Sequence, residues 1–144
     1  MEKPYTGGCA CGAIRYSIKG EPLFSNHCQC RDCQRESGSG HGSYATFARA
    51  GVTLTGEARH WDMVADNGKV KTRGFCTQCG VAVYMTFAAQ PDVFTIRAAS
   101  LDEPARYRPQ AVTFAARGHE WDPLDPGLVK FDGMPPGQSA RFLF

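Results

Sequence analysis

Short runs of β-branched and aromatic residues, separated by turn-forming residues, recur along most of the chain. Glycine, proline, asparagine and aspartate interrupt these runs at residues 20–22, 66–68 and 90–92. The runs have the length and composition of strands, and they cover residues 13–18, 43–48, 52–55, 82–87, 93–97 and 111–114. The pattern predicts an all-β domain. Lys69, Lys71 and Arg73 alternate with other residues, which predicts the exposed face of a further strand.

The remainder of the chain predicts one short helical turn and a C-terminal tail. The turn is expected at residues 31–37, directly after three closely spaced cysteines. Beyond Trp121 the sequence becomes rich in proline and glycine. We therefore expect a β domain over residues 1–122, with residues 123–144 as a tail that packs on this domain or trails from it.

Charge and hydropathy exclude several classes of partner. The 144 residues have a formal net charge of +2, and their basic residues are scattered, so we expect no nucleic-acid partner. No apolar stretch approaches the length of a membrane span, so we expect no membrane association. The first residues lack the apolar run of a secretory signal, which predicts a reducing, cytoplasmic environment.

The cysteines add candidate chemistry to this picture. Structural zinc takes four tetrahedral ligands, whereas catalytic zinc often takes three protein ligands and keeps an open position. The seven cysteines fall into three tight clusters: Cys9 and Cys11; Cys28, Cys30 and Cys33; and Cys76 and Cys79. Close spacing allows neighbouring thiolates to converge on one ion. The count therefore predicts one closed zinc site and one open site.

Two ways of dividing the cysteines are compatible with these spacings. In the favoured division, the two distant pairs form one site, and the three cysteines within residues 28–33 form the other. A rival division joins Cys30 and Cys33 to the pair at 76 and 79 as a zinc ribbon. It is less favoured because it separates Cys28 from its immediate neighbours. His27 is a candidate fourth ligand for the open site, although consecutive residues of an extended strand point to opposite faces.

Other uses of these thiols stay open at this point. Thiolates also bind iron–sulfur clusters, and disulfides are a further possibility. An odd number of cysteines and the absence of a secretory signal argue against a disulfide framework.

Three motifs resemble those of a known family. They are GCACGAIRY at residues 8–16, HCQCRDCQRESG at residues 27–38 and RGFCTQCG at residues 73–80. The pattern resembles the glutathione-dependent formaldehyde-activating enzyme family, which also includes centromere protein V-like proteins. The likeness extends over most of residues 5–122. Gln29 departs from the pattern, since many relatives have histidine between the first two cysteines of this motif.

The resemblance implies a fold and two metal sites. The fold is a β-tent of packed antiparallel sheets. Cys9, Cys11, Cys76 and Cys79 correspond to the family's structural zinc ligands, and Cys28, Cys30 and Cys33 to its catalytic ones. Two zinc ions per chain are therefore expected, the second of them labile.

The resemblance also implies an activity. It is that of a zinc-dependent carbon–sulfur lyase, or S-(hydroxymethyl)glutathione synthase, which joins a small-molecule thiol such as glutathione to formaldehyde or a similar small aldehyde. Glutathione carries two carboxylates, and Arg31 and Arg35 are candidate contacts for them. Two other hypotheses are a zinc-stabilised β-tent binding module without turnover, and metal storage by an exposed three-cysteine cluster. A pure binding scaffold needs only the four-cysteine site, so the three additional cysteines favour the enzyme.

Overall fold

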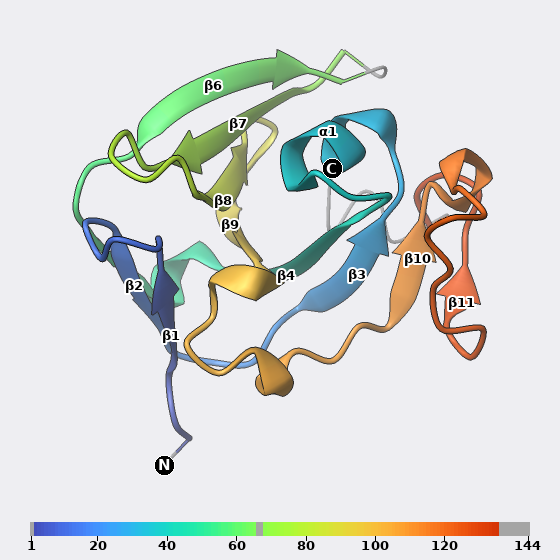
Figure 1. Ribbon diagram of the computed structural model, residues 1–144. Coiled ribbons are helices and arrows are strands. Elements are labelled where there is room, and N and C mark those ends of the chain that lie inside the picture. Colours follow the sequence, from blue (N-terminus) through green and yellow to red (C-terminus); the bar gives the residue numbers. More distant parts are fainter. Residues whose placement is uncertain (1, 66–67, 136–144) are drawn as a thin grey trace.

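The computed structural model describes residues 2–65 and 68–135 (Figure 1). Strands dominate it, with one α-helix, α1 (Arg31–Ser37), and short 3₁₀ turns among the described residues. The strands are β1 (Tyr5–Gly8), β2 (Arg15–Ile18), β3 (Phe24–Cys28), β4 (Gly42–Ala48), β5 (Val52–Thr55), β6 (Arg59–Val64), β7 (Val70–Phe75), β8 (Ala82–Phe87), β9 (Gln90–Arg97), β10 (Ala111–Thr113) and β11 (Val129–Lys130). The all-β prediction is confirmed, and α1 has the predicted bounds.

The described strands form two sheets. A three-stranded sheet has the order β1-β2-β5, and an eight-stranded sheet has the order β11-β10-β3-β4-β9-β8-β7-β6. Most neighbouring strands are antiparallel, but β10 runs parallel to both β3 and β11. Figure 1 shows the small sheet beside the large one. Helix α1 lies over another part of the large sheet, away from the small sheet.

Alternation along the central strands gives the large sheet two different faces. On β4, Ala45 and Phe47 pack in the main core, whereas Tyr44 packs in a second cluster. On β9, Phe94 and Ile96 belong to the main core, and Thr95 between them faces a cavity on the other side. This is the period-two pattern expected of a sheet buried on both faces. One face therefore supports the core and the other supports a site.

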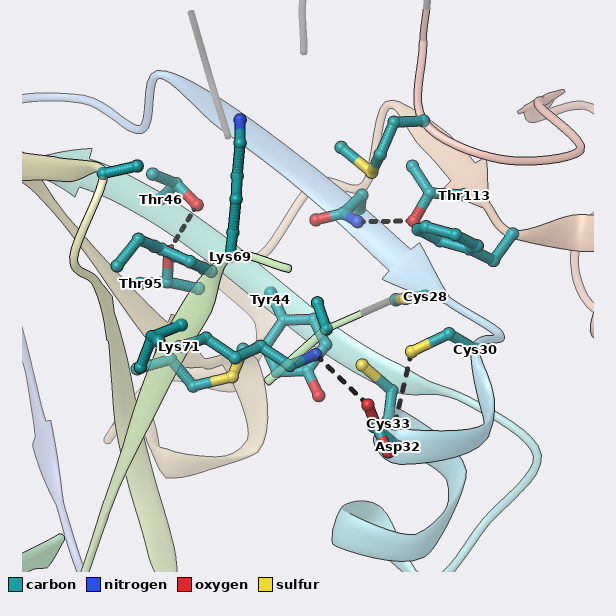
Figure 2. A pocket seen from close by; sticks show the side chains of 18 residues that line it. Cys28, Cys30, Asp32, Cys33, Tyr44, Thr46, Lys69, Lys71, Thr95 and Thr113 are labelled. Carbon is teal, nitrogen blue, oxygen red and sulfur yellow. Dashed lines mark hydrogen bonds and ion pairs between the residues drawn. The ribbon is translucent and has the colours of Figure 1, made fainter. Parts of the chain in front are cut away.

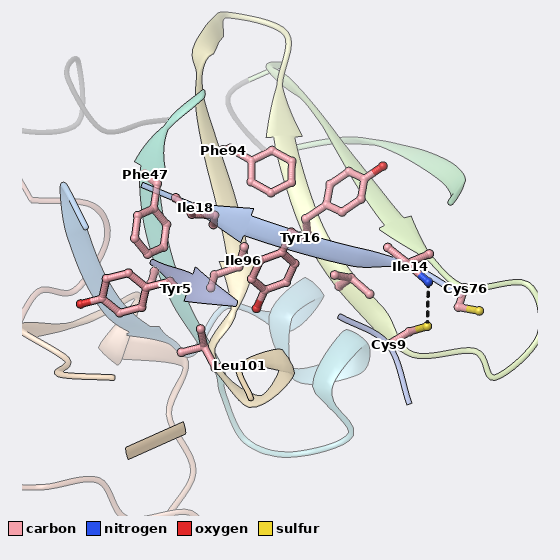
Figure 3. Close-up of a cluster of buried hydrophobic side chains, with 13 residues drawn as sticks. Tyr5, Cys9, Ile14, Tyr16, Ile18, Phe47, Cys76, Phe94, Ile96 and Leu101 are labelled. Atoms are coloured by element: carbon pink, nitrogen blue, oxygen red, sulfur yellow. Dashed lines mark hydrogen bonds between the residues drawn. The ribbon is translucent and has the colours of Figure 1, made fainter. Parts of the chain in front are cut away.

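The main core lies between the two sheets (Figure 3). Ile14, Ile18 and Ile96 have no exposed surface, and Phe47 and Phe94 are 1% exposed. Full burial of an aliphatic or aromatic side chain stabilises a protein by roughly 1.5–3 kcal/mol. Cys9 and Cys76 pack at one end of this core.

Helix α1 is short but firmly held. Cys30 is its N-cap, with Sγ accepting a hydrogen bond from the Cys33 N–H at 3.4 Å, and Gly38 ends it with a φ of 72°. A left-handed residue at that position satisfies a free carbonyl, and glycine adopts it without strain. The buried Gln34 side chain donates to the Gln29 carbonyl at 2.8 Å. These bonds fix the helix that carries Cys33.

Several sequence predictions differ from the structure. Strands β1, β3, β6 and β11 were not among the predicted runs, and residues 90–92 begin β9 rather than interrupt the chain. Lys71 and Arg73 are not on an exposed strand face, because they point toward α1 and pair with its acidic residues. Asp66, Asn67 and residues 136–144 of the predicted turn and tail lie outside the described residues.

Candidate metal centres and the adjoining cavity

Two similar loops bring four cysteines together at one end of the core. One loop follows β1, where the Cys9 N–H donates to the Ile14 carbonyl at 3.1 Å. The other follows β7, where the Cys76 N–H donates to the Val81 carbonyl at 3.0 Å. Each loop turns back on itself and carries two cysteines. The four sulfurs of Cys9, Cys11, Cys76 and Cys79 lie within 4.8 Å of one another. We call this set the four-cysteine cluster.

The sulfur spacing of the four-cysteine cluster fits a tetrahedral metal site. Cys11 Sγ lies 3.7 Å from Cys9 Sγ and 3.6 Å from Cys76 Sγ. Four sulfurs at about 2.3 Å from a central zinc ion are separated by about 3.8 Å from one another. Backbone N–H groups also support negative sulfur, since Ile14 N–H donates to Cys9 Sγ at 3.3 Å. The cluster could therefore hold a metal ion.

A second set of sulfurs, the three-cysteine cluster, is built where β3 passes into α1. Cys28 is the last residue of β3, Cys30 is the N-cap of α1 and Cys33 lies in its first turn. Their sulfurs all lie within 4.8 Å of one another. Cys28 and Cys33 are 7% and 2% exposed, so the cluster is buried rather than displayed on the surface. All seven cysteines are free thiols, so the disulfide alternative is not realised.

In the three-cysteine cluster one thiol ionises readily, and the other two then resist ionisation. Hydrogen bonds from Cys28 and Cys33 lower the pKa of Cys30. Hydrogen bonding with Cys30 raises the pKa of Cys28, and hydrogen bonding with Cys28 raises that of Cys33. This is the behaviour of closely packed like charges. A cation among them would allow all three to ionise.

Lys71 brings a positive charge to the same place. It projects from β7 with its side chain 14% exposed, and Nζ lies 4.0 Å from Asp32 Oδ2 on α1. Burial alone would lower the pKa of Lys71, but the sulfurs of Cys33, Cys30 and Cys28 outweigh this and raise it. The lysine is therefore held in its charged form beside the cluster.

A buried ion cluster fastens α1 to the sheet below. The Glu36 side chain is 1% exposed, and its carboxylate lies 3.1 Å from Arg97 Nε and 3.6 Å from Arg73 Nη1. Burial raises the pKa of Glu36, and the two arginines oppose that rise. A further bond runs from Arg97 Nη2 to the Glu36 carbonyl at 2.9 Å. These contacts tie the helix to β7 and β9.

The three-cysteine cluster opens on a cavity of about 220 Å³ over the second face of the large sheet (Figure 2). The cavity wall includes Lys71 and Tyr44 near the sulfurs, Met85 and Phe87 from β8, and Phe114 after β10. Figure 2 shows the three sulfurs gathered at one end and the Thr46–Thr95 pair toward the other. The four-cysteine cluster borders none of this cavity.

Three other candidate residues, His27, Arg31 and Arg35, belong neither to the sulfur cluster nor to the cavity lining. His27 is not part of the sulfur cluster; its Nδ1 is 2.8 Å from Ser43 Oγ, and its ring lies against Tyr107. Arg31 and Arg35 are exposed and line no part of the cavity. Arg31 Nη1 donates to Gln34 Oε1 at 3.0 Å. Their contact with glutathione carboxylates stays a prediction.

The sequence does not indicate which residues surround the three sulfurs. It predicts an exposed strand face for Lys71, and only strands for Tyr44, Met85 and Phe87. The sequence does carry a signal that the strand of Lys71 is not fully exposed. Val70, Gly74 and Phe75 lie among its basic residues, and β7 is half-buried. The groups that Lys71 faces, however, are set by tertiary packing.

The fold and the two sulfur clusters define an all-β protein with one four-cysteine and one three-cysteine candidate metal site. A family model for glutathione-dependent formaldehyde-activating enzymes matches residues 4–117, and the chain belongs to this family. The fold is also similar to the crystal structure of a Rhodobacter sphaeroides protein, with a TM-score of 0.54 and 17% identity over 87% of this chain and 97% of that one. In the described part of the chain, no helix has the length and apolar character needed to cross a membrane.

Proposed function

We propose that the protein condenses glutathione, or a related thiol, with formaldehyde or a similar small aldehyde to give a hemithioacetal such as the S-hydroxymethyl adduct, as a zinc-dependent carbon–sulfur lyase. The observation that carries this proposal is the three-cysteine cluster at the end of a cavity, with Lys71 beside it. Three protein ligands are typical of catalytic zinc, and four of structural zinc. Membership of the formaldehyde-activating family supplies the substrate class.

Cys28, Cys30 and Cys33 would hold the catalytic ion, and the four-cysteine cluster would hold a structural one. When bound, zinc supplies the positive charge that keeps a coordinated thiol deprotonated at neutral pH. The helix–sheet contacts of Glu36 keep Cys33 in register with Cys28. The sulfur positions are thus fixed by the fold before any substrate arrives.

Lys71 and the cavity wall would contribute to the bond-forming step. The thiolate sulfur attacks the formaldehyde carbon, and the carbonyl electron pair moves to oxygen, which then takes a proton. Lys71 Nζ, held beside the sulfurs, is placed to stabilise the developing negative oxygen. Met85 and Phe87 are 4% and 9% exposed and limit access of water to the reacting atoms.

The experiment is to measure exchange between free glutathione and its S-hydroxymethyl adduct at equilibrium by NMR. Zinc-loaded protein is expected to raise the exchange rate above the spontaneous rate. Cys28→Ser should abolish the increase while leaving the circular dichroism spectrum unchanged. Absence of any acceleration at full zinc loading would defeat the proposal and favour a binding module.

A further inference from the structure

The cavity is larger than the proposed formaldehyde chemistry needs. Formaldehyde adds two heavy atoms to the thiol sulfur, which occupy no more than the volume of about two water molecules, or about 60 Å³. The cavity holds about 220 Å³. Apolar protein cavities of about 150 Å³ already bind benzene. Most of the space beside the three-cysteine cluster therefore has no use in a reaction of formaldehyde alone.

The interior of this cavity is suited to an apolar group. Met85 and Phe87 form one side of the wall, and Phe114 and Val70 add further apolar surface. The buried polar residues of the cavity lining are hydrogen-bonded to one another. Thr46 Oγ1 lies 2.8 Å from Thr95 Oγ1, and Asn26 Nδ2 donates to Thr113 Oγ1 at 2.9 Å. These four polar residues are at most 5% exposed.

The two lysines that line the cavity have different surroundings. Lys71 is engaged with Asp32 and the sulfurs, and Lys69 is exposed at the rim. Glutathione carries two carboxylates, an ammonium group and two amides, all of which lose free energy if they leave water without partners. Its peptide is therefore best accommodated at the rim, near Lys69. The apolar interior is left for the substituent of the other reactant.

We propose that the carbonyl substrate carries an apolar chain or ring of about six carbons, seated against Met85 and Phe87. This inference deepens the proposed function and rests on it for the identity of the reaction. The step is the same addition: the thiolate sulfur bonds to the aldehyde carbon, the carbonyl π bond breaks and the oxygen takes a proton. No oxidant or reductant is involved. The product is a hemithioacetal with an apolar arm in the cavity.

The first test uses stable thioethers that need no turnover. S-methylglutathione and S-hexylglutathione share the peptide and differ only in the apolar arm, and their dissociation constants can be measured by isothermal titration calorimetry. Burial of each methylene strengthens binding by about fourfold. We expect the hexyl compound to bind at least tenfold more tightly. Equal affinities for the two compounds would overturn the inference.

A matched pair of variants locates the effect. Met85→Gln places a polar amide on the cavity wall at nearly constant volume, and Met63→Gln makes the same change on β6, away from the cavity. Met85→Gln should weaken binding of the hexyl compound about tenfold and change methyl binding less than twofold. Met63→Gln should change neither. Equal losses in the two variants would contradict the assignment of the arm to this cavity.

Exchange kinetics separate this inference from the proposed function. Acceleration of the formaldehyde reaction without acceleration of the hexanal reaction would leave the proposed function standing and overturn the inference. A preference for hexanethiol with formaldehyde over glutathione with hexanal would place the apolar group on the thiol and also overturn it. Greater acceleration with hexanal than with formaldehyde would support it.

Discussion

The two cysteine clusters are made of the same side chain, yet the fold surrounds them differently. The four-cysteine cluster joins two loops at one end of the main core, and it offers four sulfurs within 4.8 Å of one another. The three-cysteine cluster lies on the other face of the large sheet, beside a cavity and a lysine. The number of sulfurs and the neighbouring space distinguish the two, and the cluster beside the cavity is the more buried one. Cys11 in the four-cysteine cluster is exposed, whereas Cys28 and Cys33 are buried.

This difference suggests a division of labour. Four protein ligands around a metal ion stabilise a fold and leave no position for a substrate. An incomplete set beside a cavity leaves one. Variants that break one cluster at a time, or that alter the surroundings of the three-cysteine cluster, would test this division.

The largest effect is expected from Cys76→Ser. Cys76 is 2% exposed in the main core and links the β7–β8 loop to Cys11. Structural zinc contributes on the order of 10 kcal/mol to the folding of small zinc domains. The variant should lose cooperative thermal unfolding, followed by circular dichroism, and should bind less zinc by elemental analysis. A variant with a wild-type melting temperature would mean that the four-cysteine cluster is not the structural site.

Cys33→Ser should act on activity and spare the fold. The side chain belongs to the incomplete set, so we expect the rate of adduct exchange to fall at least 100-fold, or about 2.7 kcal/mol. The melting temperature should change by only a few degrees. Paired measurements of activity, zinc content and melting temperature on Cys33→Ser and Cys76→Ser provide the comparison. Equal destabilisation by both would erase the distinction between the clusters.

Glu36→Ala tests whether the helix that carries Cys33 depends on its buried ion cluster. The change leaves Arg73 and Arg97 partly buried without their carboxylate. Removing one partner of a buried pair typically costs about 3–5 kcal/mol, and we expect about 3 here because both arginines keep some exposure. Urea denaturation would measure it. Glu57→Ala, on an exposed residue, serves as the control and should cost less than 0.5 kcal/mol.

Lys71→Met should lower activity by about tenfold and leave the zinc content of the protein unchanged. The variant keeps an unbranched side chain, one atom shorter than lysine, and removes the charge beside the three sulfurs. A tenfold change corresponds to about 1.4 kcal/mol of transition-state stabilisation. Lys130→Met, at an exposed position on β11, should have no effect. An unchanged rate in Lys71→Met would show that the lysine has only a structural part.

The smallest effects concern glutathione carboxylates. Lys69→Gln removes an exposed charge at the cavity rim, and Arg35→Gln removes one on the outer side of α1. Exposed ion pairs contribute about 0.2–1 kcal/mol, so the KM for glutathione should rise about twofold to fourfold where a contact exists. A rise in Lys69→Gln alone would place the peptide at the rim. A rise in Arg35→Gln would support the contact predicted from the sequence.

The sequence was a good guide to the elements whose pattern is local. Short runs of β-branched and aromatic residues predict β4, β5 and β8 nearly to the residue, and α1 lies where a helical turn is predicted, directly after the three closely spaced cysteines. Strand β6 was not recognised, because an edge strand with exposed Trp61 and Val64 lacks a buried face to impose alternation. Its pairing with β7 is decided by the hairpin rather than by hydrophobic pattern.

The candidate site divides in the same way. The sulfurs that the structure brings together are those that the spacing favoured as two sets, because each pair or triplet lies within one turn or loop. The surroundings were not accessible from the sequence. Lys71 faces Asp32 only because the fold brings β7 close to α1, and Met85 lines the cavity only because β8 presents one face to it. The substrate contacts expected at Arg31 and Arg35 were chosen by nearness in sequence, which does not place a side chain in a cavity.

The four-cysteine cluster also has a consequence for how the chain reaches its native state. Cys11 and Cys76 are separated by 65 residues, and their sulfurs lie 3.6 Å apart. Closing a flexible loop of that length opposes folding by about 4 kcal/mol of chain entropy. A metal ion bound by both loops early in folding would offset this loss of chain entropy before the sheets pair. The rate of folding, and not only the final stability, should therefore depend on the zinc concentration available while the chain folds.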